Sequence, residues 1–150
     1  MSLLNNILKA EGNTISSITE NNRPVVIVTA DRQEYHKVTN TMKAYGSVNI
    51  VYNDIKTFSN EAIVDLTKNN DVKQIQLIGN AKLNQEKSKI SASKLTYNNL
   101  TDQAVATGNV YSDIISEDNK RIEVWSNYQS YDKRNNIVSA SGKSFYTNYS

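Results

Sequence analysis

Hydrophobic and polar positions alternate with a period of two along most of this chain, which is typical of β-strands that bury one face. In the clearest example, Met42, Ala44, Gly46, Val48 and Ile50 share one parity, and the residues between them are mostly polar. Such alternation places the apolar set on one face of a sheet. The pattern therefore predicts strands that line a common interior.

Short polar clusters interrupt these alternating runs at regular intervals and predict turns. They leave about eight or nine strands of roughly 10 residues, with no spacer long enough for the helical crossover that parallel strands require. We therefore expect one all-β domain over residues 1–150, an antiparallel meander built from hairpin repeats. The predicted turns lie at 19–22, 37–40, 53–54, 68–71, 84–88, 98–99, 116–119 and 132–136.

The glycines repeat with a similar period. All five are separated by 34, 33, 29 and 34 residues, and self-similarity at about 20–50 residues is the signature of a repeat architecture. Each has a small or apolar residue two positions before it and, in most copies, another two positions after it. The glycines are Gly12, Gly46, Gly79, Gly108 and Gly142, and the residues that follow are Thr14, Val48, Ala81, Val110 and Ser144.

A second set of small residues precedes four of the glycines by 16 or 17 positions: Ala30, Ala62, Ala92 and Ser126. We interpret each pair as a hairpin with a small residue on the incoming strand and glycine on the outgoing one. Glycine inside a strand marks a bulge, a bend or a close backbone approach. Aligned at one level of a sheet, these positions predict that the sheet coils sharply there.

Composition and charge narrow the function. Seventeen Lys and Arg against fifteen Asp and Glu give a net charge of +2 without any block of like charge. Nucleic-acid binding requires a basic patch, so we expect no nucleic-acid partner. Only 38% of residues are hydrophobic, which predicts a narrow interior. The longest apolar runs are about four residues, too short for a helix that spans a bilayer.

No pattern of a catalytic or metal centre is found. The chain has no cysteine, so thiol catalysis, cysteine-ligated zinc and disulfides are excluded. The single histidine, His36, stands beside Tyr35 and Lys37 near a predicted turn, and we expect it on the surface. No phosphate-binding glycine loop is present. The sequence therefore predicts a protein that is not an enzyme and has no cofactor or metal.

An ordered series of short segments resembles the OstA-like (LptA) family. The segments are 25–31 (VVIVTAD), 44–50 (AYGSVNI), 90–97 (ISASKLTY) and 106–110 (ATGNV), and the resemblance covers about Pro24 to Gly142. Ser47, Ala81 and Lys143 depart from the usual Gly-Asn-Val of that family.

The resemblance implies a twisted, open-ended antiparallel β-jellyroll with an apolar inside that holds the acyl chains of lipopolysaccharide. The inward parity then predicts the groove lining, with Val26 and Val28 at the strand position where the family contacts lipid. An aspartate at Val48 is accordingly expected to block lipid capture and leave the sheet intact. The predicted lipid-binding residues are Val26, Val28, Val48, Ile50, Leu83 and Val110.

The same resemblance implies a periplasmic carrier that bridges inner- and outer-membrane components of lipopolysaccharide transport. Residues 1–10 are too short and polar for the apolar segment of a signal peptide, so we expect that signal to be absent from this sequence. Unpaired edge strands recruit further strands. We therefore expect head-to-tail homo-oligomers and contacts with similar jellyroll domains through residues 15–28 and 137–145.

Two alternatives remain open at this level. The same module is also compatible with the periplasmic part of a larger outer-membrane lipopolysaccharide assembly protein. The six predicted lining residues are also compatible with a filled sandwich core, in which case the chain is a structural, self-associating β-module without lipid.

Overall fold

The computed structural model describes residues 2–4, 6–135, 137–142 and 145–149. Ser144 and Lys143, which belong to the glycine pattern above, lie outside these residues. The described residues form eleven strands: β1 (Ser2–Leu4), β2 (Ile7–Glu20), β3 (Arg23–His36), β4 (Thr41–Tyr52), β5 (Ile55–Leu66), β6 (Val72–Gln85), β7 (Ser88–Asn98), β8 (Gln103–Ile115), β9 (Arg121–Asp132), β10 (Ile137–Ser141) and β11 (Phe145–Tyr149).

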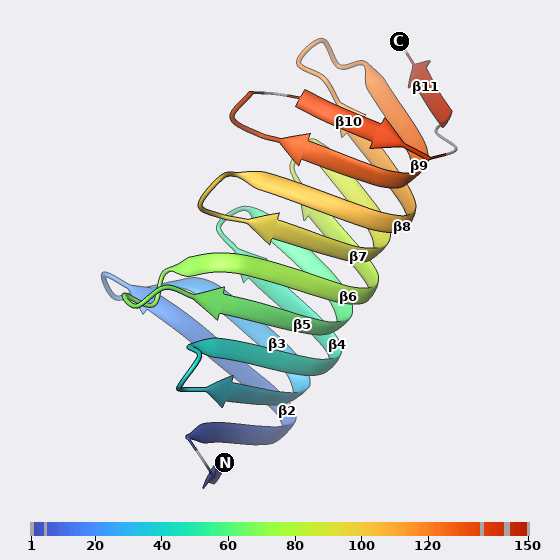
Figure 1. Ribbon diagram of the computed structural model, residues 1–150. Helices are drawn as coiled ribbons and strands as arrows, with labels where there is room; N and C mark the ends of the chain where they lie inside the picture. Colours follow the sequence, from blue (N-terminus) through green and yellow to red (C-terminus); the bar gives the residue numbers. More distant parts are fainter. Residues whose placement is uncertain (1, 5, 136, 143–144, 150) are drawn as a thin grey trace.

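The strands form a single antiparallel sheet in chain order, which confirms the predicted meander (Figure 1). Each strand from β1 to β9 pairs with the next, and β10 and β11 both pair with β9. β10 lies against residues 128–132 and β11 against residues 121–125, so the two are halves of one broken strand. The sheet exceeds the predicted eight or nine strands because of this break and because of β1.

All long strands bend near their middle, which folds the sheet into two facing layers (Figure 1). The front layer in Figure 1 contains residues 32–36, 41–45, 61–66, 72–78, 94–98, 103–107 and 128–132, and the rear layer contains residues 14–20, 23–29, 48–52, 55–58, 81–85, 88–91, 110–115 and 121–126. The bends join the layers along one side. The hairpin turns lie along the opposite, open side.

The bend is made by the repeated glycine. In β8, Gly108 and Asn109 have φ angles of 81° and 47°, and the pairing with β9 shifts register between Thr107 and Val110. Two consecutive left-handed residues form a bulge that turns the strand. The same pair of left-handed residues recurs at 12–13, 46–47 and 79–80. The glycines thus stand at the corner of the sheet, as the sequence predicts.

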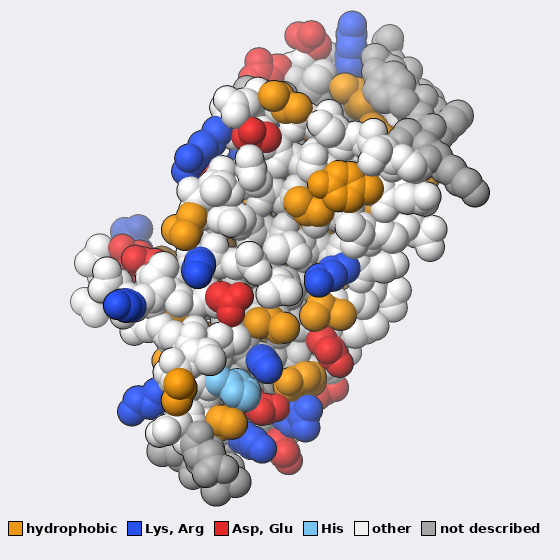
Figure 2. Space-filling view, in the orientation of Figure 1, with side chains coloured by type: hydrophobic (Ala, Val, Ile, Leu, Met, Phe, Trp, Pro, Cys, Tyr) orange, Lys and Arg blue, Asp and Glu red, His pale blue; other side chains and the backbone are white. Residues whose placement is uncertain are grey.

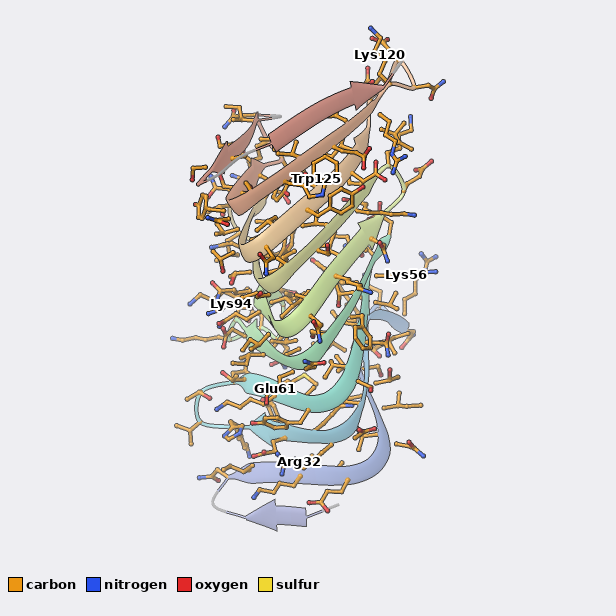
Figure 3. The ribbon with its side chains drawn as sticks, turned by 90° about the vertical axis from the view of Figure 1, so that its right-hand side faces the viewer. Arg32, Lys56, Glu61, Lys94, Lys120 and Trp125 are labelled. Carbon is orange, nitrogen blue, oxygen red and sulfur yellow. The ribbon has the colours of Figure 1, made fainter. Side chains whose placement is uncertain are left out.

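At Gly108, close packing against the neighbouring strand leaves no room for a side chain. A Cβ atom on Gly108 would lie 2.7 Å from Ser93 Oγ and 2.8 Å from Ser93 Cβ on the neighbouring strand. On the outside of the corner, Arg32, Glu61 and Lys94 lie on every second strand, β3, β5 and β7 (Figure 3). These charged residues keep the convex side of the bend in water.

One member of the predicted small-residue series is wrong. Ser59, and not Ala62, pairs with Val48 at the level where Ala92 pairs with Ala81. Ala62 lies beyond the bend, opposite Ala44 and Leu77. The prediction assumed equal hairpins, but the β5–β6 hairpin is longer than the other front-layer hairpins, so constant spacing points to the wrong residue.

Apolar side chains from both layers fill the space between them. The buried cluster extends from β3 to β8 and includes Ile50, Leu77 and Leu95, each 0–1% exposed. β9 contributes only Val124 to the buried hydrophobic residues. The core is therefore closed over most of the sheet and thins toward its C-terminal end. Among the described residues, no helix is long and apolar enough to cross a membrane.

Candidate functional site

Between the two layers, the core gives way to an open cavity toward the C-terminal end of the sheet. The cavity has a volume of about 500 Å³, within the range of ordinary ligand sites. Rear-layer strands and the front-layer ends of β7 to β10 both contribute to its wall. Its aliphatic lining consists of Ile55, Leu83, Ile90, Ala104, Ile114, Ile137 and Val138. We call it the C-terminal cavity.

All six residues that the sequence predicts as lining lie on the inner face of the rear layer, and all are buried. Val26, Val48 and Ile50 are 0% exposed, and Val28 and Val110 lie beside them in the closed core. Only Leu83 reaches the C-terminal cavity. The alternation thus correctly identifies residues of the inner face. Five of the six, however, lie in the closed core, where other side chains already fill the space.

The sequence prediction did not include the residues that carry most of the cavity surface. Ile114 has the parity of Val110 four residues earlier, so the same alternation identifies it. Val138 pairs with Tyr131 on the last front-layer strand and is 47% exposed, because no further strand covers it. The position of a residue along the chain could have identified these side chains. An inward residue on the last strand of the sheet has no neighbouring strand beyond it and stays accessible.

Two tyrosines, Tyr97 and Tyr131, contribute hydroxyl groups to the cavity wall, whose rim also carries the charged side chains of Asp102, Glu117, Asp132 and Lys133. The Tyr131 hydroxyl hydrogen-bonds with Gln129 Oε1, and burial raises the pKa of Tyr131 to about 12. The Tyr97 hydroxyl donates to Asp102 Oδ1 at 2.7 Å, and burial followed by that hydrogen bond raises the pKa of Tyr97. Both phenols are therefore neutral hydrogen-bonding groups at physiological pH.

A second cavity, of about 690 Å³, lies on the open side of the roll between the hairpin tips of the two layers. Its wall includes Glu20 and Asn53 from the rear layer and Asn70, Asp71 and Asn99 from the front layer. We call it the edge cavity. Its polar wall contrasts with the aliphatic wall of the C-terminal cavity.

Neither cavity wall includes a histidine among its described residues. Within the described part of the chain, no group of three or more His, Cys, Asp or Glu residues is arranged to hold a metal ion. His36 is partly buried, with its Nε2 atom 3.4 Å from Glu34 Oε1, and it lines neither cavity. The aliphatic and polar side chains of the two walls can bind apolar and hydroxyl-bearing groups without covalent chemistry.

The two ends of the sheet expose strand edges. In the rear layer, β2 pairs only with β3, since β1 covers residues 7–9 alone, and Ile15 on this edge is 75% exposed. At the other end, β10 pairs only with β9. Residues 25–28 of the predicted docking segment are not an edge, because β3 is paired on both sides by β2 and β4.

The surface between these ends is mixed in charge. Lys and Arg side chains alternate with Asp and Glu over the face in Figure 2, and hydrophobic side chains appear in small groups. On the outer side of the rear layer, the Tyr111 and Trp125 rings stack with centroids 5.1 Å apart. The Arg121 guanidinium forms a two-pronged contact with the Asp113 carboxylate, with both N···O distances 2.9 Å.

A solved structure with the same architecture is LptH from Pseudomonas aeruginosa, described as the LptA homologous periplasmic component of a conserved lipopolysaccharide transport device. The two structures align with a TM-score of 0.67 over 78% of this chain and 82% of LptH. This chain has the LptH fold. Sequence identity to LptH is only 18%. The all-β jellyroll expected from the sequence is confirmed by this match.

Sequence comparisons give no further relatives. No family model matches the chain, and no curated protein sequence matches it either. The likeness to LptH is therefore one of fold, at 18% sequence identity.

Proposed function

We propose that this chain is a carrier that binds the acyl chains of lipopolysaccharide between the two layers of its folded sheet. The observation that supports the proposal is the C-terminal cavity, which is aliphatic, open at the end of the roll and lined in part by the exposed Val138 side chain. A surface of that kind is unfavourable in water unless an apolar ligand or partner covers it.

The energetics fit transport without chemistry. Each methylene withdrawn from water contributes about 0.8 kcal/mol, so shielding about ten methylenes contributes roughly 8 kcal/mol before the cost of association. Binding of this size is strong enough for capture and weak enough for release to a partner. The closed core between β3 and β8 means that chains reach further inward only if the two layers separate.

Periplasmic location and end-to-end assembly belong to the same proposal. One end of the sheet has the free edges of β1 in the front layer and β2 in the rear layer, and the other end has those of β10 in the front layer and β11 in the rear layer. Pairing β1 with β10 and β2 with β11 of another copy therefore extends both layers of the roll. Such a contact is heterologous and builds an open chain of subunits. Similar jellyroll domains in the two membranes would dock on the same edges.

Adjacent residues of β8 provide a matched test. Ile114 lines the C-terminal cavity, whereas Ile115 is 41% exposed and lies on the opposite parity. With a photo-crosslinking amino acid at either position and lipopolysaccharide added, we expect labelling at Ile114 and little at Ile115. Equal labelling at both, or none at Ile114, would contradict the carrier and favour a structural β-module without lipid.

Assembly is tested separately by light scattering of the unmodified protein over a range of concentrations. Growth in mass with concentration supports end-to-end docking. A monomer at high concentration that still labels at Ile114 would leave lipid capture intact and disprove self-assembly.

A further inference from the structure

The edge cavity lies beside a hairpin that is longer than its counterparts in the repeat. Gly79 follows Asn60, its neighbour across the bend, by 19 positions, whereas Gly108 follows Ser93 by 15. The extra residues lengthen the front-layer hairpin formed by β5 and β6. The β2–β3 hairpin of the rear layer is also long, with 14 residues in each strand. In Figure 1 both tips extend from the open side of the roll, and both line the edge cavity.

Side chains that bind hydroxyl groups dominate this wall. Amides donate and accept hydrogen bonds, and carboxylates accept them. No Lys or Arg is among the described lining residues, and the two carboxylates of Glu20 and Asp71 disfavour a phosphate by like-charge repulsion. Besides Tyr52, the polar lining residues are Thr19, Glu20, Asn53, Thr67, Asn69, Asn70, Asp71 and Asn99.

Hydrogen bonds hold part of this wall in place before any ligand binds. The Asn99 amide donates to the Val72 carbonyl at 3.0 Å, and the turn is closed by the Thr67 N–H, which donates to the Asp71 carbonyl at 2.8 Å. Asn70 Oδ1 accepts from the Asn40 amide at 3.1 Å. A preorganised wall lowers the entropy cost of binding.

A small void in the core lies between the edge cavity and the C-terminal cavity and shares wall residues with both. A void of about 10 Å³ lies between the layers, and Tyr52 belongs to both its wall and the wall of the edge cavity. Ile55, Leu83 and Tyr97 belong to the wall of the void and to that of the C-terminal cavity. A polar compartment and an apolar one thus stand next to each other, separated by tyrosine rings.

We infer that the edge cavity binds the uncharged, hydroxyl-rich saccharide part of the amphiphile whose acyl chains occupy the C-terminal cavity. This inference rests on the proposed function. The Tyr52 ring, with the aliphatic Ile18 and Val25, provides an apolar surface for the C–H faces of a sugar. The surrounding amides and carboxylates provide partners for its hydroxyls.

The test uses three probes: a delipidated, dephosphorylated lipopolysaccharide core saccharide, the same saccharide with its phosphates, and a fluorescent fatty acid. The variant is Asn69→Ala with Asp71→Ala, which removes two polar side chains of the front-layer turn. Lys68→Ala on the same turn is the matched control, because Lys68 does not line the cavity. Calorimetry measures saccharide binding, and circular dichroism checks the fold.

We expect the double variant to bind the dephosphorylated saccharide about tenfold more weakly, the effect of losing one or two net hydrogen bonds. Fatty-acid affinity should stay within about twofold, as should both affinities in Lys68→Ala. Failure of the unmodified protein to bind the dephosphorylated saccharide, or equal binding by the double variant, would overturn the inference.

A second variant separates sugar from phosphate recognition. Glu20→Gln with Asp71→Asn removes two negative charges and keeps the hydrogen-bonding shape. Tighter binding of the phosphorylated saccharide by this variant is the expected result, because the repulsion from Glu20 and Asp71 is removed. Tighter binding of the phosphorylated than of the dephosphorylated saccharide by the unmodified protein would instead identify a phosphate site and overturn the inference. A protein that binds the saccharide but no fatty acid would disprove the acyl carrier and leave the saccharide site standing.

Discussion

Gln33 and Gln129 hold equivalent positions on β3 and β9, and each donates its side-chain amide to a carbonyl five residues earlier, across the bend. The acceptors are Val28 at 3.1 Å and Val124 at 3.0 Å. The equivalent positions on β5 and β7 are the apolar Ala62 and Leu95. Both ends of the filled core are thus closed by a buried glutamine.

Replacing the C-terminal glutamine should destabilise the fold although leucine has nearly the same size. Gln129→Leu leaves the Val124 carbonyl and the Tyr131 hydroxyl without their partner. Each buried polar group left unsatisfied costs about 1–3 kcal/mol, so we expect a loss of about 2–4 kcal/mol in urea unfolding. Gln76→Leu, on the outward parity of β6, is the control and should change stability little. A Gln129→Leu protein as stable as the unmodified one would show that this closure is dispensable.

Alanine at two of the corner glycines should separate backbone strain from steric clash. Gly12 and Gly108 have φ angles of 80° and 81°, but a Cβ on Gly12 meets nothing within 4 Å, whereas one on Gly108 overlaps Ser93. Strain alone costs about 1–2 kcal/mol. We expect Gly12→Ala to cost that much in thermal or urea unfolding and Gly108→Ala to cost clearly more. Adding Ser93→Gly should recover part of the Gly108→Ala loss, and equal costs at both glycines would disprove the role of the clash.

Stability should fall at alkaline pH because of Tyr131. Burial raises its pKa from 10.0 to about 12 in the folded protein, so the unfolded chain loses this proton first as the pH rises. The contribution is complete below pH 10 and is lost between about pH 10 and 12, by roughly 3 kcal/mol. Unfolding in urea at pH 8 and pH 11 should show a smaller pH-dependent loss for Tyr131→Phe than for the unmodified protein. An identical loss in both would assign the effect to other groups.

Aspartate at two valines should distinguish the closed core from the cavity. Val48 is 0% exposed and Val138 is 47% exposed. A buried, unpaired carboxylate costs about 4 kcal/mol or more, so Val48→Asp is expected to unfold the protein and not merely to block lipid capture. Val138→Asp should change stability by about 1 kcal/mol or less and still weaken lipopolysaccharide binding. Val38→Asp, in an exposed turn, is the control for both measurements, and a folded Val48→Asp protein would contradict the closed core.

The architecture follows from sequence because its two signals are local. Alternation places Val48 and Ile50 on one face, and the recurring left-handed Gly-Asn pair locates the bend without any knowledge of partners. The prediction for Ala62 was wrong because the hairpin formed by residues 61–78 is longer than its counterparts. The number of extra residues is even, so the alternation of inward and outward side chains is unchanged and gives no sign of the insertion. Constant spacing is a weaker guide than the glycine together with the single polar residue that follows it.

The site is less predictable than the fold. Parity identifies which residues point inward, but whether that space is filled depends on the opposite layer, which the sequence does not place. Val26 and Val110 meet front-layer side chains, whereas Val138 lacks a covering strand only because it comes last. The edge cavity requires two hairpin tips, residues 20–23 and 67–71, that are distant in sequence and become neighbours only after the sheet bends.

Each long strand has its own bend, so the length of the passage between the two layers is set by the number of strands. Neighbouring strands lie about 4.8 Å apart, so duplicating or deleting one hairpin changes the length of the passage by about 10 Å and leaves its cross-section as it was. Two different sequence changes therefore alter the two dimensions of the passage. The number of hairpins sets its length, and the number of residues on either side of the bend sets its cross-section.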